Sequence, residues 1–536
     1  MSSPRPATPR PTRLTRLATH VSGTLASSAN VSPTELSVTG VTLDSRRVQP
    51  GDLYAALPGA NAHGAQFAEQ AMAAGATAVL TDPEGIRVMA GAGLTPPVIV
   101  VDDPRAVLGG LSAIVYGTDE MAPRLIGITG TNGKTTTAYL IASALEALGR
   151  RTGLIGTVET RIGTERIKSA RTTPESPDLH GILGLMSEEG LDDCVMEVSS
   201  HALALHRVDG VVYDLALFTN LSQDHLDFHR TMAEYFDAKA ALFTPERARA
   251  GLVCIDDEWG RRLAERATIP VTTLASDPAA GADWTVQAGH GDARFTLTGV
   301  LDGRLTTLDL ASALPGDFNR VNTAMAAVTL LLDGHGPDAV AAAVLTPPYV
   351  PGRMEPVTAT VPVDGAPTAV VDYAHTPDAV AALVRALRPE TPGRLVVLVG
   401  AGGDRDREKR PRMGAAAADG ADVVVVTDDN PRSEVPADIR SAVADGARAA
   451  GTDATIIDVE GRREAIAVAV RAAVEGGRGS TVALVGKGHE TGQEIAGTVH
   501  PFDDREELRA ALDAALGTTS PNRMAPDRTP TPEVDA

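Results

Sequence analysis

The stretch Arg124–Thr137, RLIGITGTNGKTTT, says most about the fold. An apolar run leads into the glycine loop Gly130–Gly133, and Lys134 opens an alanine-rich helical segment. Backbone N–H groups of such a loop cradle phosphates, the lysine reaches the β- and γ-phosphates, and Thr135 offers a hydroxyl to Mg²⁺. The stretch departs from the usual P-loop pattern, because Ile128 stands where that pattern has its first glycine. It predicts a strand, a phosphate loop and a helix in an α/β sheet.

The same alternation of β-branched apolar runs and alanine-rich helical segments covers residues 121–346 and 347–517. It predicts two α/β domains with parallel strands covered by helices on both faces: a central P-loop ATPase-like domain and a C-terminal Rossmann-like domain. The prolines of Thr346–Val357, TPPYVPGRMEPV, separate the two, because proline is excluded from helix interiors. Ligands bind such sheets beyond the carboxyl ends of the strands, so the residues that follow each strand are the candidates.

The remaining segments are less regular. Residues 21–120 contain short apolar runs broken by Pro-Gly, Asp-Ser and glycine-rich turns, which predict a smaller N-terminal α/β domain. Residues 1–20 are rich in proline and arginine and have no apolar signal-peptide core, so we expect a disordered arm. Residues 518–536 are rich in proline, threonine and charge, and we expect a disordered tail.

The bulk composition limits the function classes. With a formal net charge of −21 and 3% aromatic residues, the 536-residue chain lacks the overall basic charge and the stacking aromatics of nucleic-acid binders. No segment approaches the roughly 20 apolar residues of a membrane helix. Cys194 and Cys254 lie in apolar runs and are expected to be buried thiols. We expect a cytoplasmic, monomeric protein with small-molecule substrates and neither nucleic-acid nor membrane partners.

Four ionisable side chains of the central block are candidate site residues. Glu197 lies near the end of an apolar run and could ligate Mg²⁺ or be a lone acid. His225 and His229 are four residues apart, which on a helix would suggest zinc, but Leu226 replaces the glutamate of an H-E-x-x-H motif. Lys239 stands in an apolar helical segment, and composition alone favours a lysine whose stem packs on the core.

In the C-terminal block, three strands end in charged loops. GRLVVLV leads to GAGGDRDREKR, ADVVVVT to DDNPRSE, and STVALVG to KGHETGQ. If these strands are parallel, Arg405, Asp429–Arg432 and Gly486–Glu490 converge at one edge of one sheet. A ligand that fits this edge carries both carboxylate and ammonium groups. The alternative is three solvated loops that pair their own charges.

Six motifs in this order resemble the Mur ligases of peptidoglycan synthesis, over about residues 35–515. They are GTNGKTT, EVSSHAL, FTNLSQDHLD, YFDAKAALF, GDFNRVNTAMAA and PGRMEPV. The resemblance implies an ATP-dependent amide ligase. A substrate carboxylate is activated as an acyl phosphate, an amine attacks it, and phosphate leaves. Because the carboxylate and the γ-phosphate are both anionic, this chemistry needs Mg²⁺ and lysine to offset charge.

The resemblance also implies roles for individual residues. Lys239 would be carbamylated by CO₂ to N6-carboxylysine, which requires a neutral amine, and an apolar neighbourhood favours that form. Catalysis would use Lys134, His225 and Lys239. Mg²⁺, two ions by this match, would be held by Thr135, Glu197, His225 and the carbamate of Lys239. ATP would be bound by Gly130, Thr131, Asn132, Gly133, Lys134, Thr135, Thr136, Asn319, Asn322, Arg353 and Asp372.

The first block, with TLDSRRVQPGDLYAALPG followed by ANAHG, resembles the uridine-diphosphate domain of the third peptide-adding ligase. The family often has His-Gln-Ala where this chain has Ala60-Asn61-Ala62, and Leu205 stands where relatives have glutamine. A cationic Arg207 suits a substrate that bears phosphates and carboxylates. The UDP-substrate contacts would be Leu43, Ser45, Ala60, Asn61, Ala62, Thr172, Thr173, Ser199, Leu205 and Arg207.

The tetrapeptide DNPR, Asp429–Arg432, resembles the branch of the family that adds meso-diaminopimelate to UDP-N-acetylmuramoyl-L-alanyl-D-glutamate. Lysine is diaminopimelate without the distal carboxylate, so Arg432 has a partner in diaminopimelate and none in lysine. The amino-acid contacts would be Arg405, Asp429, Asn430, Pro431, Arg432, Gly486 and Glu490. Two alternatives stay open: a lysine-adding ligase of the same family, and a nucleotide-binding regulator without catalysis.

Overall fold

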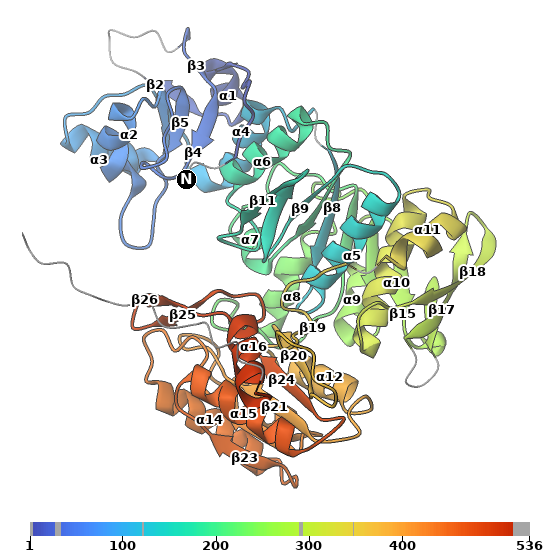
Figure 1. Cartoon of the computed structure of the whole chain (residues 1–536). Helices are drawn as coiled ribbons and strands as arrows, with labels where there is room; N and C mark the ends of the chain where they lie inside the picture. The colour runs from blue at the N-terminus through green and yellow to red at the C-terminus, as the bar shows by residue number, and fades with distance from the viewer. Residues whose placement is uncertain (1–3, 27–33, 121–122, 289–292, 347, 518–536) are drawn as a thin grey trace, which may run out of the picture. The chain divides into compact units, whose positions relative to one another are not determined.

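The computed structural model describes residues 4–26, 34–120, 123–288, 293–346 and 348–517 (Figure 1). The chain divides into two compact units, Met1–Val350 and Pro351–Ala536. This division lies beside the predicted boundary between residues 346 and 347. The predicted C-terminal tail, from residue 518 on, lies outside the described residues.

The first sheet belongs to the predicted small α/β domain and has four parallel strands with one antiparallel edge strand. Its inner strands β5 and β6 are buried throughout, as expected of parallel strands covered on both faces. In spatial order the strands are β2 (Thr24–Ala26), β7 (Val98–Val100), β6 (Ala78–Thr81), β5 (Asp52–Ala55) and β4 (Gly40–Thr42). The helical segments are η1 (Gly64–Phe67), α2 (Ala68–Ala73), α3 (Pro83–Gly91) and α4 (Pro104–Tyr116).

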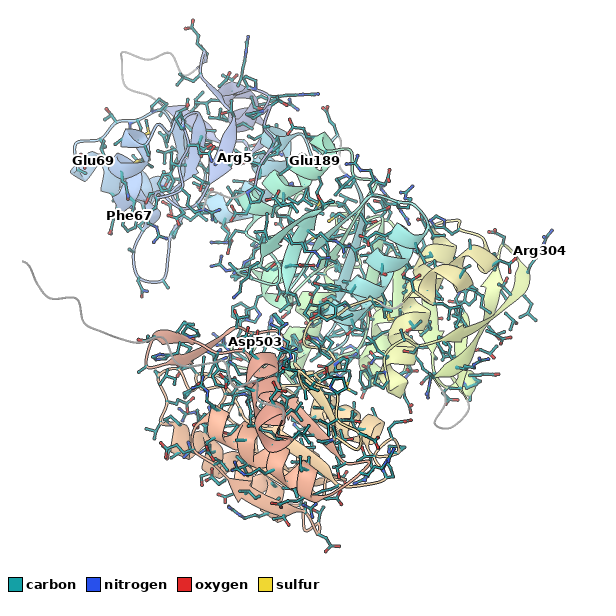
Figure 2. The ribbon with its side chains drawn as sticks, viewed as in Figure 1. Arg5, Phe67, Glu69, Glu189, Arg304 and Asp503 are labelled. Atoms are coloured by element: carbon teal, nitrogen blue, oxygen red, sulfur yellow. The ribbon has the colours of Figure 1, made fainter. Side chains whose placement is uncertain are left out.

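Part of the predicted N-terminal arm is folded, so the expectation of disorder up to residue 20 is wrong. Leu14 and Leu17 are fully buried, and their helical spacing packs a short helix on the core of the first domain. Upstream of them, Arg5 lies against the first domain (Figure 2). It donates to the buried carboxylate of Asp52 at 2.6 Å. The many prolines and arginines of the arm conceal this apolar face in the sequence. The folded elements are β1 (Thr12–Arg13), α1 (Leu14–His20) and β3 (Ser37–Val38), which pairs with β1.

The second sheet has eleven strands, parallel from β9 to β16 and antiparallel at both ends. In spatial order the strands are β11 (Glu165–Lys168), β10 (Glu159–Ile162), β9 (Thr152–Ile155), β12 (Asp193–Glu197), β8 (Arg124–Thr129), β13 (Leu215–Phe218), β14 (Gly251–Cys254), β15 (Val271–Ala275), β16 (Trp284–Ala288), β17 (Arg294–Leu301) and β18 (Arg304–Ala311). The helical segments are α5 (Lys134–Ala147), α6 (Ser176–Glu188), α7 (Ser200–Ala204), α8 (Met232–Ala240), α9 (Glu258–Arg266), η2 (Pro278–Ala280), α10 (Asp317–Leu332) and α11 (Pro337–Val344).

Helices cover both faces of this sheet. Side chains of α5, α10 and α11 form one apolar core against it, and side chains of α6, α8 and α9 form another (Figure 1). Strands β12, β8 and β13 are neighbours and run parallel. The loops that follow these three strands therefore meet at one edge, which is where the sequence places its phosphate loop.

The second unit holds a six-stranded sheet in which all strands but β19 are parallel. Strands β24, β21 and β22 are neighbours and fully buried, which confirms the predicted α/β class with parallel strands. In spatial order the strands are β19 (Glu355–Pro356), β20 (Thr368–Asp372), β24 (Thr481–Val485), β21 (Leu395–Val399), β22 (Val423–Val426) and β23 (Thr455–Asp458). The other elements are α12 (Pro377–Leu387), α13 (Lys409–Ala418), α14 (Pro436–Ala449), α15 (Arg462–Glu475), α16 (Asp504–Ala515) and the hairpin of β25 (Gly492–Ile495) and β26 (Thr498–Pro501).

Candidate active site

The loop between β8 and α5 has the backbone shape of a phosphate site. Gly130 and Gly133 have φ of +140° and +87°, which glycine adopts most readily. A Cβ on Gly130 would lie 2.0 Å from Thr219 Oγ1, so the loop also passes too close to β13 for a side chain. Lys134 Nζ donates to the carbonyls of Gly130 and Thr131 at 2.8 and 2.9 Å. Its ammonium thus folds back over the loop that it would serve.

The sequence analysis did not assign Asn220, which holds this loop from the next strand. The N–H of Thr131 donates to its carbonyl at 2.9 Å, and the N–H of Asn132 donates to its side-chain oxygen at 3.0 Å. Its amide nitrogen donates back to the carbonyl of Asn132 at 3.1 Å. Asn220 stands two residues after the end of β13, so the inspection of strand ends could have found it.

The carboxylate of Glu197, at the end of β12, lies against the start of α5. Thr135 Oγ1 donates to both of its oxygens at 3.0 Å. Thr157, which the sequence analysis also missed, donates through its N–H at 2.7 Å and its hydroxyl at 3.0 Å. A buried carboxylate beside a threonine hydroxyl is the oxygen-rich donor set that Mg²⁺ prefers. These residues therefore fit the metal that the sequence predicts here.

Lys239, on α8, is 1% exposed and reaches the same edge. Its Nζ donates to the carbonyl of Gly130 at 2.8 Å and lies 4.7 Å from the ring centroid of Tyr235. Burial lowers the pKa of the Lys239 ammonium well below its ordinary value, and the charge of Lys134 lowers it further. A neutral amine at the phosphate loop is the state that carbamylation requires, so the surroundings of Lys239 fit that modification.

His225 and His229 lie in the turn before α8 and not on a helix, so they lack the geometry of a helical zinc pair. His225 has a left-handed backbone, with φ of +56°, and its ring stands edge-on to His201 with centroids 4.9 Å apart. His229 is buried, and its Nε2 forms a hydrogen bond with Ser200 Oγ at 2.8 Å. Burial, with the charges of His201 and Lys239, lowers the pKa of His229 to about 4. Among the described residues, no group of three or more His, Cys, Asp or Glu could hold a metal ion by itself.

Two asparagines of α10 lie beside the phosphate loop. A Cβ on Gly133 would lie 2.7 Å from Asn322 Oδ1, and Thr137 Oγ1 donates to the same oxygen at 3.3 Å. Asn319 accepts from Asn322 Nδ2 at 3.1 Å. The structure thus places both asparagines next to the N-terminus of α5, where the family resemblance puts the nucleotide.

A cavity of about 600 Å³ lies between the first two blocks of the N-terminal unit. Its lining includes three residues predicted to contact the UDP-substrate: Leu43, Ser45 and Ala62. Two others of that prediction, Ala60 and Asn61, precede Ala62 in the same loop but are not among the lining residues. Four arginines, which the sequence analysis did not assign, make the cavity suitable for phosphates and carboxylates. They are Arg46, Arg47, Arg105 and Arg171.

The residues predicted to grip the peptidyl end gather beyond β12. Thr173 Oγ1 donates to the carbonyl of Glu197 at 2.9 Å and accepts from the N–H of Ser199 at 3.1 Å. Thr172 accepts from Thr157 Oγ1 at 3.1 Å. The predicted peptide contacts and the predicted metal ligand therefore share one hydrogen-bonded network.

Arg207 and Leu205 do not line the described cavity, but each contacts a residue that does. Arg207 Nε is 2.9 Å from Glu175, a carboxylate that also faces Arg105 at 3.2 Å and Arg171 at 4.0 Å. Leu205 takes part through its backbone, since its carbonyl accepts from Arg105 Nη1 at 3.3 Å. Glu175 thus pairs with Arg207 and with two of the arginines that line the cavity, Arg105 and Arg171.

The second unit brings together the predicted amino-acid residues that follow β22 and β24. Asn430 Nδ2 donates to Glu490 Oε2 at 2.9 Å. Asp429 Oδ2 lies 2.5 Å from where a Cβ on Gly486 would stand, and Gly486 has φ of +111°. Burial raises the pKa of Asp429, but the charges of Lys487 and Arg462 outweigh it and lower that pKa below its ordinary value. An ionised carboxylate therefore lies under this edge.

Arg432 and Arg405 stand at the rim of the same edge. Arg432 has φ of +52°, donates through Nη1 to the carbonyl of Gly403 at 2.7 Å, and pairs through Nε with Glu494 at 3.4 Å. A Cβ on Gly402 would lie 2.9 Å from Arg432 Nη1 and 3.7 Å from Arg405 Cγ, so both side chains flank this glycine. The carbonyl of Pro431 would lie 1.9 Å from a Cβ on Gly403. These close approaches hold the loops after β21 and β22 against each other.

The predicted nucleotide contacts of the second unit, Arg353 and Asp372, lie near each other. The Arg353 guanidinium stacks over Tyr373 at 4.4 Å from its ring centroid. Asp372 accepts from the N–H groups of Met354 and Ala374, both at 2.7 Å. Burial raises the pKa of Asp372, and the charge of Arg353 opposes this. The carboxylate thus fixes the backbone around Arg353.

Comparison with known proteins gives three family matches, which together span most of the chain. Residues 37–116 match the Mur ligase family catalytic domain, residues 128–330 the Mur ligase middle domain, and residues 352–488 the Mur ligase glutamate ligase domain. Among the described residues, no helix is both long and apolar enough to cross a membrane.

Two curated relatives are named UDP-N-acetylmuramoyl-L-alanyl-D-glutamate–2,6-diaminopimelate ligase. The one from Streptomyces avermitilis is 50% identical over 519 residues, 96% of this chain and 99% of its own. The one from Corynebacterium glutamicum is 45% identical over 498 residues, 91% of this chain and 94% of its own. A solved structure of an enzyme with the same name is 32% identical and covers 91% of this chain and 97% of its own, with a TM-score of 0.62. This chain therefore belongs to the Mur ligase family.

Proposed function

We propose that this chain joins meso-2,6-diaminopimelate to UDP-N-acetylmuramoyl-L-alanyl-D-glutamate in an ATP-dependent ligation. The observation that carries the proposal is the match to ligases of that name over nearly the whole length of both chains. The choice of amino acid is supported by Arg432 at the rim of the edge that also holds Asp429 and Glu490, where the charge of Arg432 acts on Asp429. The product of the ligation is a peptidoglycan precursor. We propose that the chain acts in the cytoplasm as a monomer.

The first step transfers the γ-phosphoryl group of ATP to a substrate carboxylate, which gives ADP and an acyl phosphate. The phosphates would be bound by N–H groups of Gly133 and of the first turn of α5, since those of Thr131 and Asn132 donate to Asn220, and Lys134 would offset their charge. Thr135, Glu197, His225 and the carbamate of Lys239 would hold Mg²⁺. Mg²⁺ supplies positive charge that lets two anionic groups approach each other.

The carbamate of Lys239 would form from the neutral amine and CO₂. A C–N bond forms, a proton is released, and the buried lysine becomes an anionic oxygen donor. Three observations support this: its 1% exposure, its lowered pKa and its 2.8 Å contact with the phosphate loop. An ordinary ammonium at this position would repel the metal that Glu197 attracts.

In the second step an amine of diaminopimelate attacks the acyl phosphate. A C–N bond forms, the C–O bond to phosphate breaks, and the amine loses a proton. The second unit would hold the other end of the amino acid, with its carboxylate on Arg432 and its ammonium on Asp429 and Glu490. Lysine has no carboxylate at that end, so it would leave Arg432 without this partner.

The test is an ADP-release assay with ATP, Mg²⁺, the UDP-dipeptide and a panel of amino acids. We expect turnover with meso-diaminopimelate and little with lysine. Faster turnover with lysine would identify the lysine-adding ligase instead. If no amino acid supports ADP release from a folded chain that binds ATP, the chain is a nucleotide-binding regulator and the proposed function is wrong.

A further inference from the structure

Lys487 is a buried cation beneath the amino-acid edge, and the sequence analysis gave it no role. It follows Gly486 after β24, and its side chain is 0% exposed. Its Nζ donates to Asn430 Oδ1 at 3.1 Å and to Glu490 Oε2 at 3.0 Å. It therefore touches two residues that lie in separate loops and that the family resemblance assigns to the amino acid.

These contacts close a three-membered ring of hydrogen bonds. Asn430 Nδ2 also donates to Glu490 Oε2, at 2.9 Å, so Lys487, Asn430 and Glu490 contact one another pairwise. Asn430 Oδ1 accepts a further bond from the N–H of Glu494 at 3.0 Å. The Asn430 amide thus has its orientation fixed from both sides, with its oxygen toward Lys487 and its nitrogen toward Glu490.

The positive charge of Lys487 also contributes to the electrostatics of the buried group around Asp429. The neighbouring Arg462 pairs with Asp504 at 2.6 Å and lies 3.9 Å from Asp429. Together with Lys487 and Glu490, this group holds two cations and three carboxylates. Arg432 at the rim adds a third cation, so the charges balance, and an ammonium group of a ligand would be a further partner for the carboxylates Asp429 and Glu490.

We propose that Lys487 is a positioning residue for the amino-acid substrate, which orients Asn430 and Glu490 and places a positive charge beside Asp429. The inference rests on the proposed function. Its chemistry is specific: the substrate class is an amino acid with an ammonium group at the end that enters this edge.

The electrostatics around Asp429 agree with this role. Burial would raise the pKa of this carboxyl, and the positive charge of Lys487 is the largest influence that lowers it. Arg462 on α15 and Arg432 at the rim add to the effect, while Asp504 on α16 and Glu490 add negative charge. Removal of Lys487 should therefore raise the pKa of Asp429 and shift its titration toward neutral pH.

The test compares wild type with Lys487→Met, which keeps length and removes charge. We expect KM for diaminopimelate to rise about 10- to 100-fold, because hydrogen bonds to charged groups are lost. KM for ATP and for the UDP-dipeptide should stay within about twofold of wild type, since none of the residues assigned to those substrates contacts Lys487. The acid limb of the pH profile of kcat/KM for diaminopimelate should move to higher pH.

Two further variants separate position from stability. Lys487→Arg keeps the charge, so its acid limb should stay at the wild-type pH even if its bulk lowers kcat/KM. Lys168→Met, at an exposed lysine of β11, is the matched control and should resemble wild type. If the Lys487→Met chain fails to fold by circular dichroism, Lys487→Gln carries the same readouts.

The outcomes are distinct. Unchanged KM for diaminopimelate with an unmoved acid limb overturns the role of Lys487, and so does an equal rise in KM for all three substrates. If wild type itself releases no ADP with diaminopimelate, the proposed function fails first, independently of any variant.

Discussion

The nucleotide edge of the first unit and the amino-acid edge of the second both lie beyond the carboxyl ends of three neighbouring parallel strands. They are built from different parts of the chain. At the nucleotide edge, backbone groups and hydroxyls dominate: the glycine loop, Thr135 and Asn220. At the amino-acid edge, charged side chains dominate, with Lys487 and Arg462 buried beneath.

The difference follows from what each edge has to recognise. Triphosphate groups carry a high negative charge, so N–H groups at a helix N-terminus can bind them without side chains that distinguish one anion from another. Diaminopimelate has to be told from lysine, which differs by one carboxylate. A site discriminates that strongly only when it leaves a charged group unsatisfied by the wrong substrate. We propose that Arg432 is such a group. A loss of one side chain should therefore weaken the amino-acid edge more than the nucleotide edge, unless that side chain carries catalysis itself.

The largest expected effect comes from such an exception. Lys239→Ala should lower kcat about 10²- to 10³-fold, because it removes the carbamate that is proposed to hold Mg²⁺ at the reacting phosphate. Short-chain carboxylic acids should restore part of the rate by replacing the anionic oxygens of the carbamate. The measurement is ADP release with and without added acetate. Lys168→Ala, at an exposed lysine, is the control. Full activity of Lys239→Ala would remove the carbamate from the mechanism.

Arg432→Ala tests the discriminating side of the comparison. We expect kcat/KM for diaminopimelate to fall about 10- to 100-fold, because a charge-assisted contact to the distal carboxylate is lost. KM for ATP and for the UDP-dipeptide should not change. The residual turnover of lysine should stay the same, which reduces the preference for diaminopimelate.

Arg463→Ala is the matched control for this variant. Arg463 is an exposed arginine of the same unit that pairs with Glu507 on the surface. Its removal should leave the preference unchanged. If Arg432→Ala and Arg463→Ala discriminate equally well between diaminopimelate and lysine, the specificity resides elsewhere.

The parts of both edges that depend only on residues close together in the sequence could be predicted. The glycine loop is one contiguous stretch of sequence, and the strands are visible as apolar runs. The α/β class and the convergence of the loops after β21, β22 and β24 could therefore be predicted. Arg432 could be singled out because it follows one of these strands. Asn220 and Lys487 were within reach for the same reason, since each stands within two residues of a strand end.

Other site residues could not be predicted because their role depends on contacts between distant segments. Thr157 reaches Glu197 across 40 positions, and Arg462 reaches Asp504 across 42. Arg462 opens α15 just after β23, a strand that was not among the three whose ends were compared in the sequence. The folded start of the chain was missed for another reason: the burial of Leu14 and Leu17 outweighs the proline-rich composition around them.

The smallest expected effect tests whether the nucleotide edge tolerates the loss of one side chain. Thr157→Val removes the hydroxyl that donates to Glu197 at 3.0 Å but keeps the N–H that donates at 2.7 Å. The Mg²⁺ concentration for half-maximal ADP release should rise about 3- to 10-fold, since one hydrogen bond to the carboxylate is lost while the backbone one remains. The saturating rate should stay near that of wild type, and Thr307→Val, at an exposed threonine of β18, should change neither value. A loss as large as that of Arg432→Ala would mean that side chains hold the nucleotide edge as well, and the contrast between the two edges would not stand.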